Sequence, residues 1–387
     1  MSSALSLRRI SHMSSNGWDR LFKSESMVRA GLQPFEIIHK SGIHSVRHYL
    51  PLTEESIQMG ADTMPVAKKR NTIPLVLIAP LAVNMFVYDL LPERSFVRYL
   101  MAQGFDVYLI DWGKPTRKQA GLTLENYIKE FLPACLNAVR EHSGSKKLSL
   151  QGWSMGGGMA LAYTALFKDE NIHKIVTYGT PIDGHANGPI GQQYKRLAHL
   201  LKSARINFRK VPAKLLYTPG WANVIGFKLL DPVGSLKGYW NLVTQLHDRD
   251  YVAQHANQAA FIDSLEAYPG GALRDWFASI WLENETAHGH FKVGKEVALQ
   301  LSGDADAFSE ELAKPFAPIP SFWSDQFDVS LLAYGLIDQA DDIQLLEGEA
   351  GGDCVYGYYK RGELVGVCGV GMRSKVMGYR SQVGLTH

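Results

Sequence analysis

The stretch QGWSMGGGMAL (151–161) contains the pattern G-x-S-x-G, with Ser154 at its centre. KLSLQGWS (147–154) reads as a β-strand, and MALAYTALF (159–167) reads as a helix. Two glycines, Gly152 and Gly156, leave room for a sharp strand-to-helix turn that would present the serine hydroxyl above a sheet. The pattern therefore predicts a nucleophile at Ser154. The alternative is a glycine-rich turn that serves packing alone.

The surrounding sequence alternates short apolar runs with helix-length segments. The runs cover 73–80, 105–112, 147–154 and 172–181, and a helix is expected over 122–142. Strict alternation of strand and helix implies a parallel sheet with helices on both faces. Together with the serine turn, this alternation of strands and helices predicts the α/β class and, within it, the α/β-hydrolase fold.

Two backbone amides are expected to stabilise a developing oxyanion. The helix after Ser154 would point its first amides toward that charge, with Met155 as one donor. The loop after the strand at 73–80 should supply the other donor, at Leu81.

Changes along the chain in the pattern of predicted strands and helices predict its division into parts. Residues 1–70 form an N-terminal extension with leading strands, and 71–301 form the hydrolase domain, with a mostly helical, aromatic-rich lid at about 184–290. Three prolines make 302–320 an extended linker. A small β-rich unit follows at 321–387, in which strands at 353–360 and 363–370 flank a turn at Arg361-Gly362.

Composition excludes several classes of protein. The 387 residues carry 40 Lys and Arg against 38 Asp and Glu, a balance that argues against nucleic acid as the main partner. Three cysteines form no C-x-x-C pair, and His288 and His290 lack ligands at metal-binding spacing, so no metal is expected. No run is long enough for a membrane span or a secretory signal. We therefore expect a cytoplasmic protein.

The other members of a catalytic triad are harder to find. In this fold the acid and then the histidine follow the serine along the chain. VALQLSGDADAF (297–308) offers Asp304 or Asp306 as the acid, although these residues could equally be linker acids. No histidine occupies the expected late loop, so the base would come from the lid, with His247 and His185 as the candidates.

Several segments resemble a known family. APLAVNMFVYDLLPERSFVRYLMAQGFDVYLIDWGKP (79–115), with GWSMGG, YGTPID and GYWNLVTQLHDRDYV (238–252), resembles the polyhydroxyalkanoate synthases and related PhaC-like α/β-hydrolases over about 30–300. The family's usual nucleophile is cysteine, where this chain has Ser154. The resemblance implies a serine acyltransferase or hydrolase that acts on hydroxyacyl thioesters or esters through a covalent acyl-enzyme. Its substrate would be an acyl-CoA or an acyl ester.

A basic stretch in the lid has two interpretations. Its side chains could attract the phosphates of coenzyme A, or they could form a solvated helix face. The lid is also a candidate surface for homodimer formation. The stretch contains Lys195, Arg196, Lys202, Arg205, Arg209, Lys210 and Lys214.

The C-terminal part carries a second resemblance. PFAPIPSFWSDQFDVSLLAYGL (315–336) and VYGYYKRGELVGVCGVGMRSKVMGYRSQV (355–383) resemble the C-terminal domain of flavin-dependent ferredoxin reductases. Because no G-x-G-x-x-G fingerprint is present, we expect no bound flavin or other cofactor. Trp323 would be a core anchor, or it would pack on an aromatic ligand or a partner reductase.

Two other functions compete with acyl transfer. The hydrolase domain, lacking its histidine segment, could be a catalytically silent binding or scaffold protein. The C-terminal resemblance alone would suggest an oxidoreductase component related to flavin reductases.

Overall fold

The computed structural model divides into two compact units, Met1–Ser302 and Gly303–His387. The predicted linker at 302–320, with Asp304 and Asp306, lies outside the described residues. The structure describes residues 2–60, 62–186, 188–230, 232–299, 321–326, 329–335, 337, 340–350, 352–379 and 382–383.

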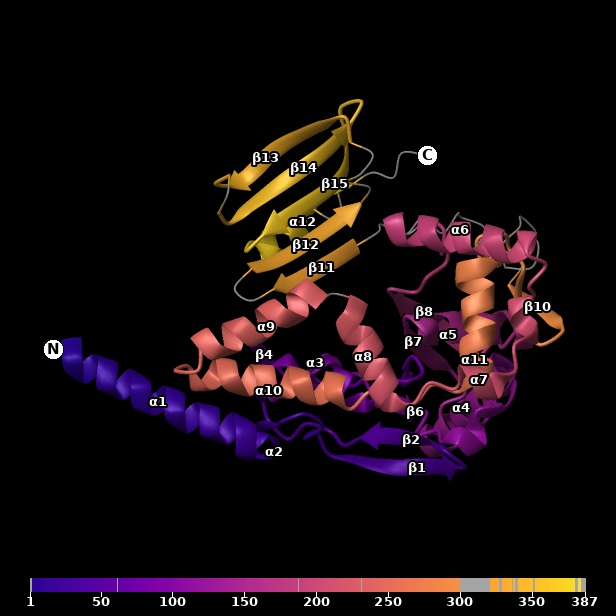
Figure 1. Ribbon diagram of the computed structural model, residues 1–387, viewed down its shortest axis with the longest axis horizontal. Helices are drawn as coiled ribbons and strands as arrows, with labels where there is room; N and C mark the ends of the chain where they lie inside the picture. Colours follow the sequence, from indigo (N-terminus) through magenta and orange to yellow (C-terminus); the bar gives the residue numbers. More distant parts are fainter. Residues whose placement is uncertain are drawn as a thin grey trace. The chain divides into compact units, whose positions relative to one another are not determined.

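A mixed sheet forms the centre of the first unit, with strand order β1-β2-β6-β5-β7-β8 (Figure 1). The neighbours among β6, β5, β7 and β8 pair in parallel, as predicted, whereas β1, β2 and β6 pair antiparallel. A tight turn at Gly42 (φ 55°) joins β1 to β2, and so short a connection permits only antiparallel pairing. The strands are β1 (Phe35–Ser41), β2 (His44–Tyr49), β5 (Leu75–Ile78), β6 (Val107–Asp111), β7 (Leu148–Trp153) and β8 (Ile172–Tyr178).

Helices cover the sheet and bury its apolar strands. Every residue of β5 is buried, as expected for a central parallel strand with both faces covered. The helix expected over 122–142 consists of a π-helical segment, η4 (Asn126–Phe131), followed by α4 (Leu132–Ser143). Pro133 lies directly after the π-helical segment, where the helix changes from the π to the α pattern of hydrogen bonds. Nearby helices are α3 (Phe96–Ala102) and α5 (Met155–Phe167).

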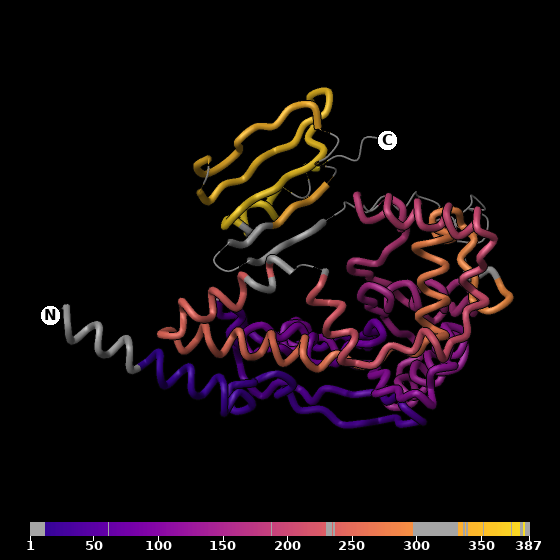
Figure 2. Tube along the Cα trace, in the orientation of Figure 1, coloured from indigo at the N-terminus to yellow at the C-terminus, as the bar shows by residue number. Residues whose placement is uncertain are grey.

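The lid is helical, as predicted. It starts after β8 and ends before a short hairpin, β9 (Phe291–Val293) with β10 (Glu296–Leu299). Figure 2 traces the chain through these helices from α6 to α11. They are α6 (Gly188–Ser203), η5 (Phe208–Lys210), α7 (Ala213–Leu216), α8 (Gly220–Leu230), α9 (Pro232–Thr244), α10 (Arg249–Asp263), α11 (Gly270–Trp276) and the π-helical η6 (Phe277–Leu282).

The central sheet ends at β8 within the described part of the chain. Val176 on this edge strand has 45% of its side chain exposed. The described residues of the run that begins at 297 belong to β10, which pairs with β9 through a tight turn at Gly294 and does not extend the central sheet. A local hairpin of this kind has a low loop-closure cost. The late strand that would carry the triad acid is therefore not among the described elements of this sheet.

Smaller elements complete the first unit. None of the helices in the described ranges combines the length and apolarity that a bilayer span requires. The remaining elements are α1 (Ser2–Phe22), α2 (Ser24–Met27), β3 (Ser56–Met59), β4 (Asp62–Pro65), η1 (Met85–Tyr88), η2 (Pro92–Arg94) and η3 (Arg117–Gln119).

In the part of the second unit that the structure describes, a five-stranded antiparallel sheet packs with the helix α12. Its strand order is β11-β12-β15-β14-β13. The predicted hairpin is confirmed, with Arg361 (φ 51°) and Gly362 (φ 84°) forming the two-residue turn between β14 and β15. The elements are β11 (Ser321–Gln326), β12 (Val329–Gly335), β13 (Asp342–Gly348), β14 (Cys354–Lys360), β15 (Glu363–Val370) and α12 (Arg373–Tyr379). The side chain of Trp323 lies outside what is described.

Candidate active site

Ser154 occupies the turn between β7 and α5 in a conformation that non-glycine residues rarely adopt. Its backbone has φ 52° and ψ −121°. The Ser154 amide donates to the carbonyl of Tyr178 at 2.7 Å, and Thr180 Oγ1 donates to the Ser154 carbonyl at 3.0 Å. The end of β8 and the residues after it thus hold the turn from one side. Strain held in place by such contacts is typical of functional sites.

Two glycines of the motif are required by close backbone contacts. A Cβ atom at Gly156 would lie 2.0 Å from the carbonyl oxygen of Ile78. At Gly152 it would lie 2.3 Å from the Cα of Gly157. Any side chain at either position would force β5, β7 and α5 apart, so the sequence pattern reflects the geometry of the turn.

The two predicted oxyanion donors are available. Met155 is the first residue of α5, where a helix leaves its amides without internal acceptors. Within the described part of the chain, neither the Met155 amide nor the Leu81 amide has a hydrogen-bond acceptor. Both side chains are buried. The Leu81 amide belongs to the loop between β5 and η1.

Contacts from the lid fix this loop. Ala82 has φ 63°, and its carbonyl accepts a hydrogen bond from the amide of Glu266 at 3.1 Å. The side-chain amide of Asn84 donates to the carbonyls of Phe261 at 3.1 Å and Ser264 at 3.0 Å. The end of α10 and the residues after it therefore hold the loop in one conformation.

Aromatic residues of the lid pack against the first turns of α5. The Tyr268 hydroxyl donates to Met155 Sδ at 3.1 Å, and burial raises the pKa of Tyr268, so this phenol stays protonated. A Cβ atom at Gly158 would lie 2.7 Å from the ring of Trp276. The surroundings of the turn are therefore largely apolar, a setting in which a hydrogen bond to a charged oxygen is strengthened.

The structure does not bring the predicted base candidates to Ser154. His185 Nε2 donates to the carbonyl of Trp281 at 3.0 Å. His247 lies in the turn between α9 and α10, beside Leu246, whose carbonyl accepts a hydrogen bond from Asn16 of α1. Figures 1 and 2 show that turn well away from β7.

The serine hydroxyl lacks a base among the residues that the structure describes. Ser154 Oγ makes no hydrogen bond to any of them. His247 Nδ1 is buried and also has no partner in the same part of the chain. The described residues thus hold a shaped turn and two amide donors, but no histidine bonded to the serine.

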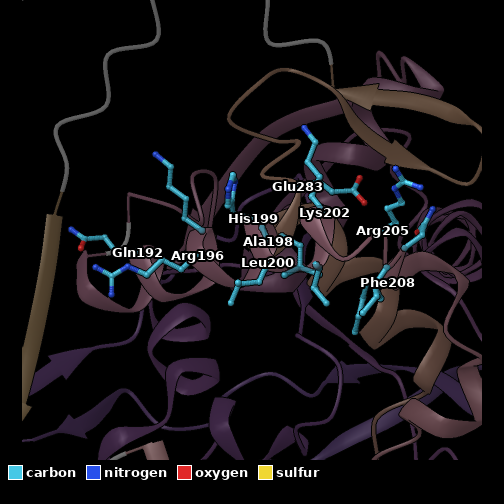
Figure 3. A pocket seen from close by; sticks show the side chains of 14 residues that line it. Gln192, Arg196, Ala198, His199, Leu200, Lys202, Arg205, Phe208 and Glu283 are labelled. Carbon is cyan, nitrogen blue, oxygen red and sulfur yellow. The ribbon is translucent and has the colours of Figure 1, made fainter.

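The basic stretch separates into two groups. Arg209 is engaged by Glu283 and Glu285, each at 3.0 Å. Four others, Lys195, Arg196, Lys202 and Arg205, lie on or just after α6 and line a groove of about 1170 Å³, whereas Lys210 and Lys214 do not line it. Figure 3 shows Arg196, Lys202 and Arg205 succeeding one another along it toward Phe208. Cations beside apolar side chains suit a ligand with both anionic and apolar parts.

Sequence reasoning missed the residues that hold the turn and its loop. Thr180, Asn84 and Tyr268 act through contacts between distant segments, such as Asn84 with Phe261. No spacing rule joins such positions. Asn84 does lie within the segment 79–115 that carries the family resemblance.

Comparison with known proteins defines the class. Residues 87–210 match the family model described as alpha/beta hydrolase fold, and residues 321–385 match the model described as Reductase C-terminal. Both agree with the turn at Ser154 and with the two units. The first unit is similar to the PhaC-like α/β-hydrolases, and the C-terminal segment matches the reductase type, so both resemblances are confirmed.

Curated relatives share the first unit. The chain is 28% identical to the poly(3-hydroxyalkanoate) polymerase subunit PhaC of Haloferax mediterranei, over 75% of this chain and 57% of that protein. It is 27% identical to the Haloarcula marismortui subunit, over 77% and 62%. It is 30% identical to the PhaC subunit of Allochromatium vinosum, over 60% of this chain and 64% of that protein. The chain therefore spans less than two thirds of the length of these relatives. Among solved structures, a putative lipase from Sulfolobus solfataricus is similar with a TM-score of 0.34 and 13% identity, over 62% of this chain and 79% of that chain.

Proposed function

We propose that Ser154 is the nucleophile of an acyltransferase or hydrolase that acts on hydroxyacyl thioesters or esters. The observation that carries the proposal is the strained turn with Ser154 at the start of α5, and the amides of Met155 and Leu81, which have no acceptor among the described residues, support it. The names of the curated relatives, which are poly(3-hydroxyalkanoate) polymerase subunits, support a hydroxyacyl substrate.

The proposed reaction has two steps, acylation and then deacylation of Ser154. Ser154 Oγ attacks the carbonyl carbon and loses its proton to a base, and the carbonyl oxygen becomes an oxyanion held by the two amides. The bond to the leaving sulfur or oxygen then breaks, the base returns the proton to that atom, and an acyl-enzyme remains. Water or a second hydroxyl group attacks this ester in the same way and releases Ser154.

The base is assigned to a lid histidine, His247 or His185, and its carboxylate partner to Asp304 or Asp306. Neither histidine is hydrogen-bonded to Ser154 in the structure. His247 Nδ1 is buried without a partner among the described residues, and His185 Nε2 donates to the Trp281 carbonyl. Replacing each histidine by glutamine separates the two. The variant that removes the base should lose most acylation, on the order of 10²-fold or more.

The groove along α6 is proposed to hold the phosphates of an acyl-CoA. Lys195 and Lys202 are exposed on its wall. Replacing both by alanine should raise KM for a CoA thioester and leave KM for a short uncharged ester unchanged. Alanine at Lys68 and Lys69, which are exposed outside the groove, is the control with the same loss of charge. Equal effects of the two pairs would remove the groove from the proposal.

Labelling with a fluorophosphonate tests the nucleophile itself. The reagent should add to the intact chain once, and peptide mapping should place the adduct at Ser154. Ser154→Ala should remain unlabelled, whereas Ser145→Ala, in the loop before β7, should label like the unaltered protein. An adduct elsewhere, or an equal adduct on Ser154→Ala, would contradict the proposal.

One observation favours a second function, that of a catalytically silent binding or scaffold protein. Ser154 Oγ has no hydrogen bond to any described residue, and the described sheet ends at β8. A properly folded chain that neither labels with fluorophosphonate nor turns over short acyl esters would support this alternative.

A further inference from the structure

A buried cluster of two histidines and one cysteine lies near the β1 edge of the central sheet, the edge opposite β8. His39 of β1, His44 of β2 and Cys135 of α4 each offer a ligand atom, and these three atoms lie within 4.8 Å of one another. His44 and Cys135 are almost completely buried. None of the three has a place in the acyl-transfer chemistry proposed above.

The imidazole nitrogens of this cluster have no protein partners. His44 is 4% exposed, and neither its Nδ1 nor its Nε2 has a hydrogen bond within the described part of the chain. His39 Nε2 is also buried and unpartnered there. Buried polar atoms are nearly always hydrogen-bonded, so three unpaired nitrogens in one place indicate a missing ligand, to which each neutral imidazole can give one lone pair.

Irregularity in the β1–β2 hairpin brings the histidines together. The pairing changes register between Ile37, opposite Arg47, and His39, opposite Val46. This bulge turns His39 to the same side of the sheet as Val46, and therefore as His44 two residues earlier. Regular pairing would have placed His39 opposite Ser45 instead. Bulges that redirect a side chain in this way are frequent beside functional sites.

The third ligand comes from the helix that covers this side. The ring of His44 stacks on Phe131 with 4.4 Å between ring centroids. Phe131 ends the π-helical segment η4, and Cys135 follows about one turn later in α4.

A neighbouring cluster provides a contrast. Glu36, His48 and His142 also lie within reach of one another, but both ring nitrogens of His48 are used, at 2.9 Å from Glu36 and 2.9 Å from Asp106. His142 Nδ1 lies 3.0 Å from the hydroxyl of Tyr108. That cluster is satisfied by protein hydrogen bonds, whereas the His39, His44 and Cys135 cluster is not.

From these observations we infer that His39, His44 and Cys135 form a binding site for a thiophilic metal ion, with Zn²⁺ as the ion the donor set fits. Two imidazoles and one thiolate are ordinary zinc ligands, and water can complete a tetrahedral set. Binding forms one Zn–S and two Zn–N bonds, and the Cys135 thiol releases its proton to solvent. The step changes no oxidation state.

The ligands need only small movements to reach zinc geometry. Zn–N bonds of about 2.0–2.1 Å and Zn–S bonds of about 2.3 Å place tetrahedral ligand atoms about 3.4–3.6 Å apart. Because the present separations are within 4.8 Å, side-chain rotation must close a gap of at most about 1.4 Å. The bound ion would fasten the hairpin of β1 and β2 to α4.

Zinc binding to the full-length protein tests the inference. The chain, stripped with a chelator and then dialysed against Zn²⁺, should retain one equivalent by elemental mass spectrometry. Cys135→Ser and His39→Gln should each weaken binding on the order of 100-fold, since even outer-shell changes cost up to this much. Cys354→Ser and His142→Gln are controls for the thiol and for the neighbouring cluster, and both should bind like the unaltered protein.

Two further readouts keep the result clear if a variant folds poorly. Co²⁺ in place of Zn²⁺ should give a thiolate-to-metal charge-transfer band that Cys135→Ser lacks. Zn²⁺ should raise the melting temperature of the unaltered chain and leave that of a folded Cys135→Ser chain unchanged. Retention of less than one equivalent, or equal affinity in Cys135→Ser and the unaltered chain, would overturn the site. Neither readout depends on Ser154.

Discussion

Replacing Ser154 by glycine should stabilise the first unit while it removes the proposed nucleophile. The residue has φ 52° and ψ −121°, a conformation that costs a non-glycine residue about 1–3 kcal/mol. Glycine avoids this cost but loses more backbone entropy on folding, about 0.4–1 kcal/mol. Ser154 Oγ has no hydrogen bond to a described residue that the change would remove. We therefore expect Ser154→Gly to be about 1 kcal/mol more stable than Ser154→Ala, which retains the Cβ atom.

Urea unfolding followed by tryptophan fluorescence measures this difference. Seven of the eight tryptophans precede residue 303, and Trp153 is adjacent to the substitution, so the signal reports the first unit. Comparing Ser154→Gly with Ser154→Ala cancels the loss of the hydroxyl. A difference of about 1 kcal/mol corresponds to about a fivefold change in the unfolding equilibrium. Equal stability, or a less stable glycine variant, would refute the claim that the turn is strained.

Three other perturbations test neighbouring parts of the structure. Gly156→Ala should destabilise the fold by about 1–3 kcal/mol or more in the same urea assay, because its Cβ would meet the Ile78 carbonyl at 2.0 Å. The control is Gly226→Ala, which has open space around it and should be neutral or stabilising. Asn84→Ala should lower kcat for a short acyl ester about tenfold with little change in KM, because it removes the hydrogen bonds that hold the Leu81 loop. An unchanged kcat would show that the loop does not need these bonds. Burial lowers the pKa of His48, but its hydrogen bonds to Asp106 and Glu36 outweigh this and leave the pKa raised. Its contribution to stability is therefore complete below about pH 6.5 and is lost as the pH rises through the folded-state pKa. The urea midpoint should thus fall as the pH rises above about 6.5, and fall less in His48→Gln.

The fold could be predicted largely because its determinants are local. The apolar runs before and after the serine motif became β5, β6, β7 and β8, since continuous apolar strands are stable only inside a covered sheet. Gly152 and Gly156 identified the turn because only glycine fits where β5, β7 and α5 approach so closely. The hairpin at Arg361-Gly362 followed from turn residues in the same way.

The candidate site was less predictable because its supporting contacts join distant segments. Asn84 bonds to Phe261 of α10 and to Ser264 just after it, 177 and 180 positions later, and no periodicity encodes this. The His39, His44 and Cys135 cluster depends on a bulge in β1, which shifts a side chain from one face to the other without any sequence signature. The choice between His247 and His185 as base depends on long-range contacts of the same kind.

The central claim is that Ser154 accepts an acyl group. Intact-protein mass spectrometry after brief exposure to a hydroxyacyl-CoA, quenched in acid, measures this directly. We predict a mass increase equal to one hydroxyacyl group, located at Ser154 by peptide mapping and absent from Ser154→Ala. A folded protein that shows no acyl adduct at Ser154, or an equal adduct in Ser154→Ala, would contradict the claim.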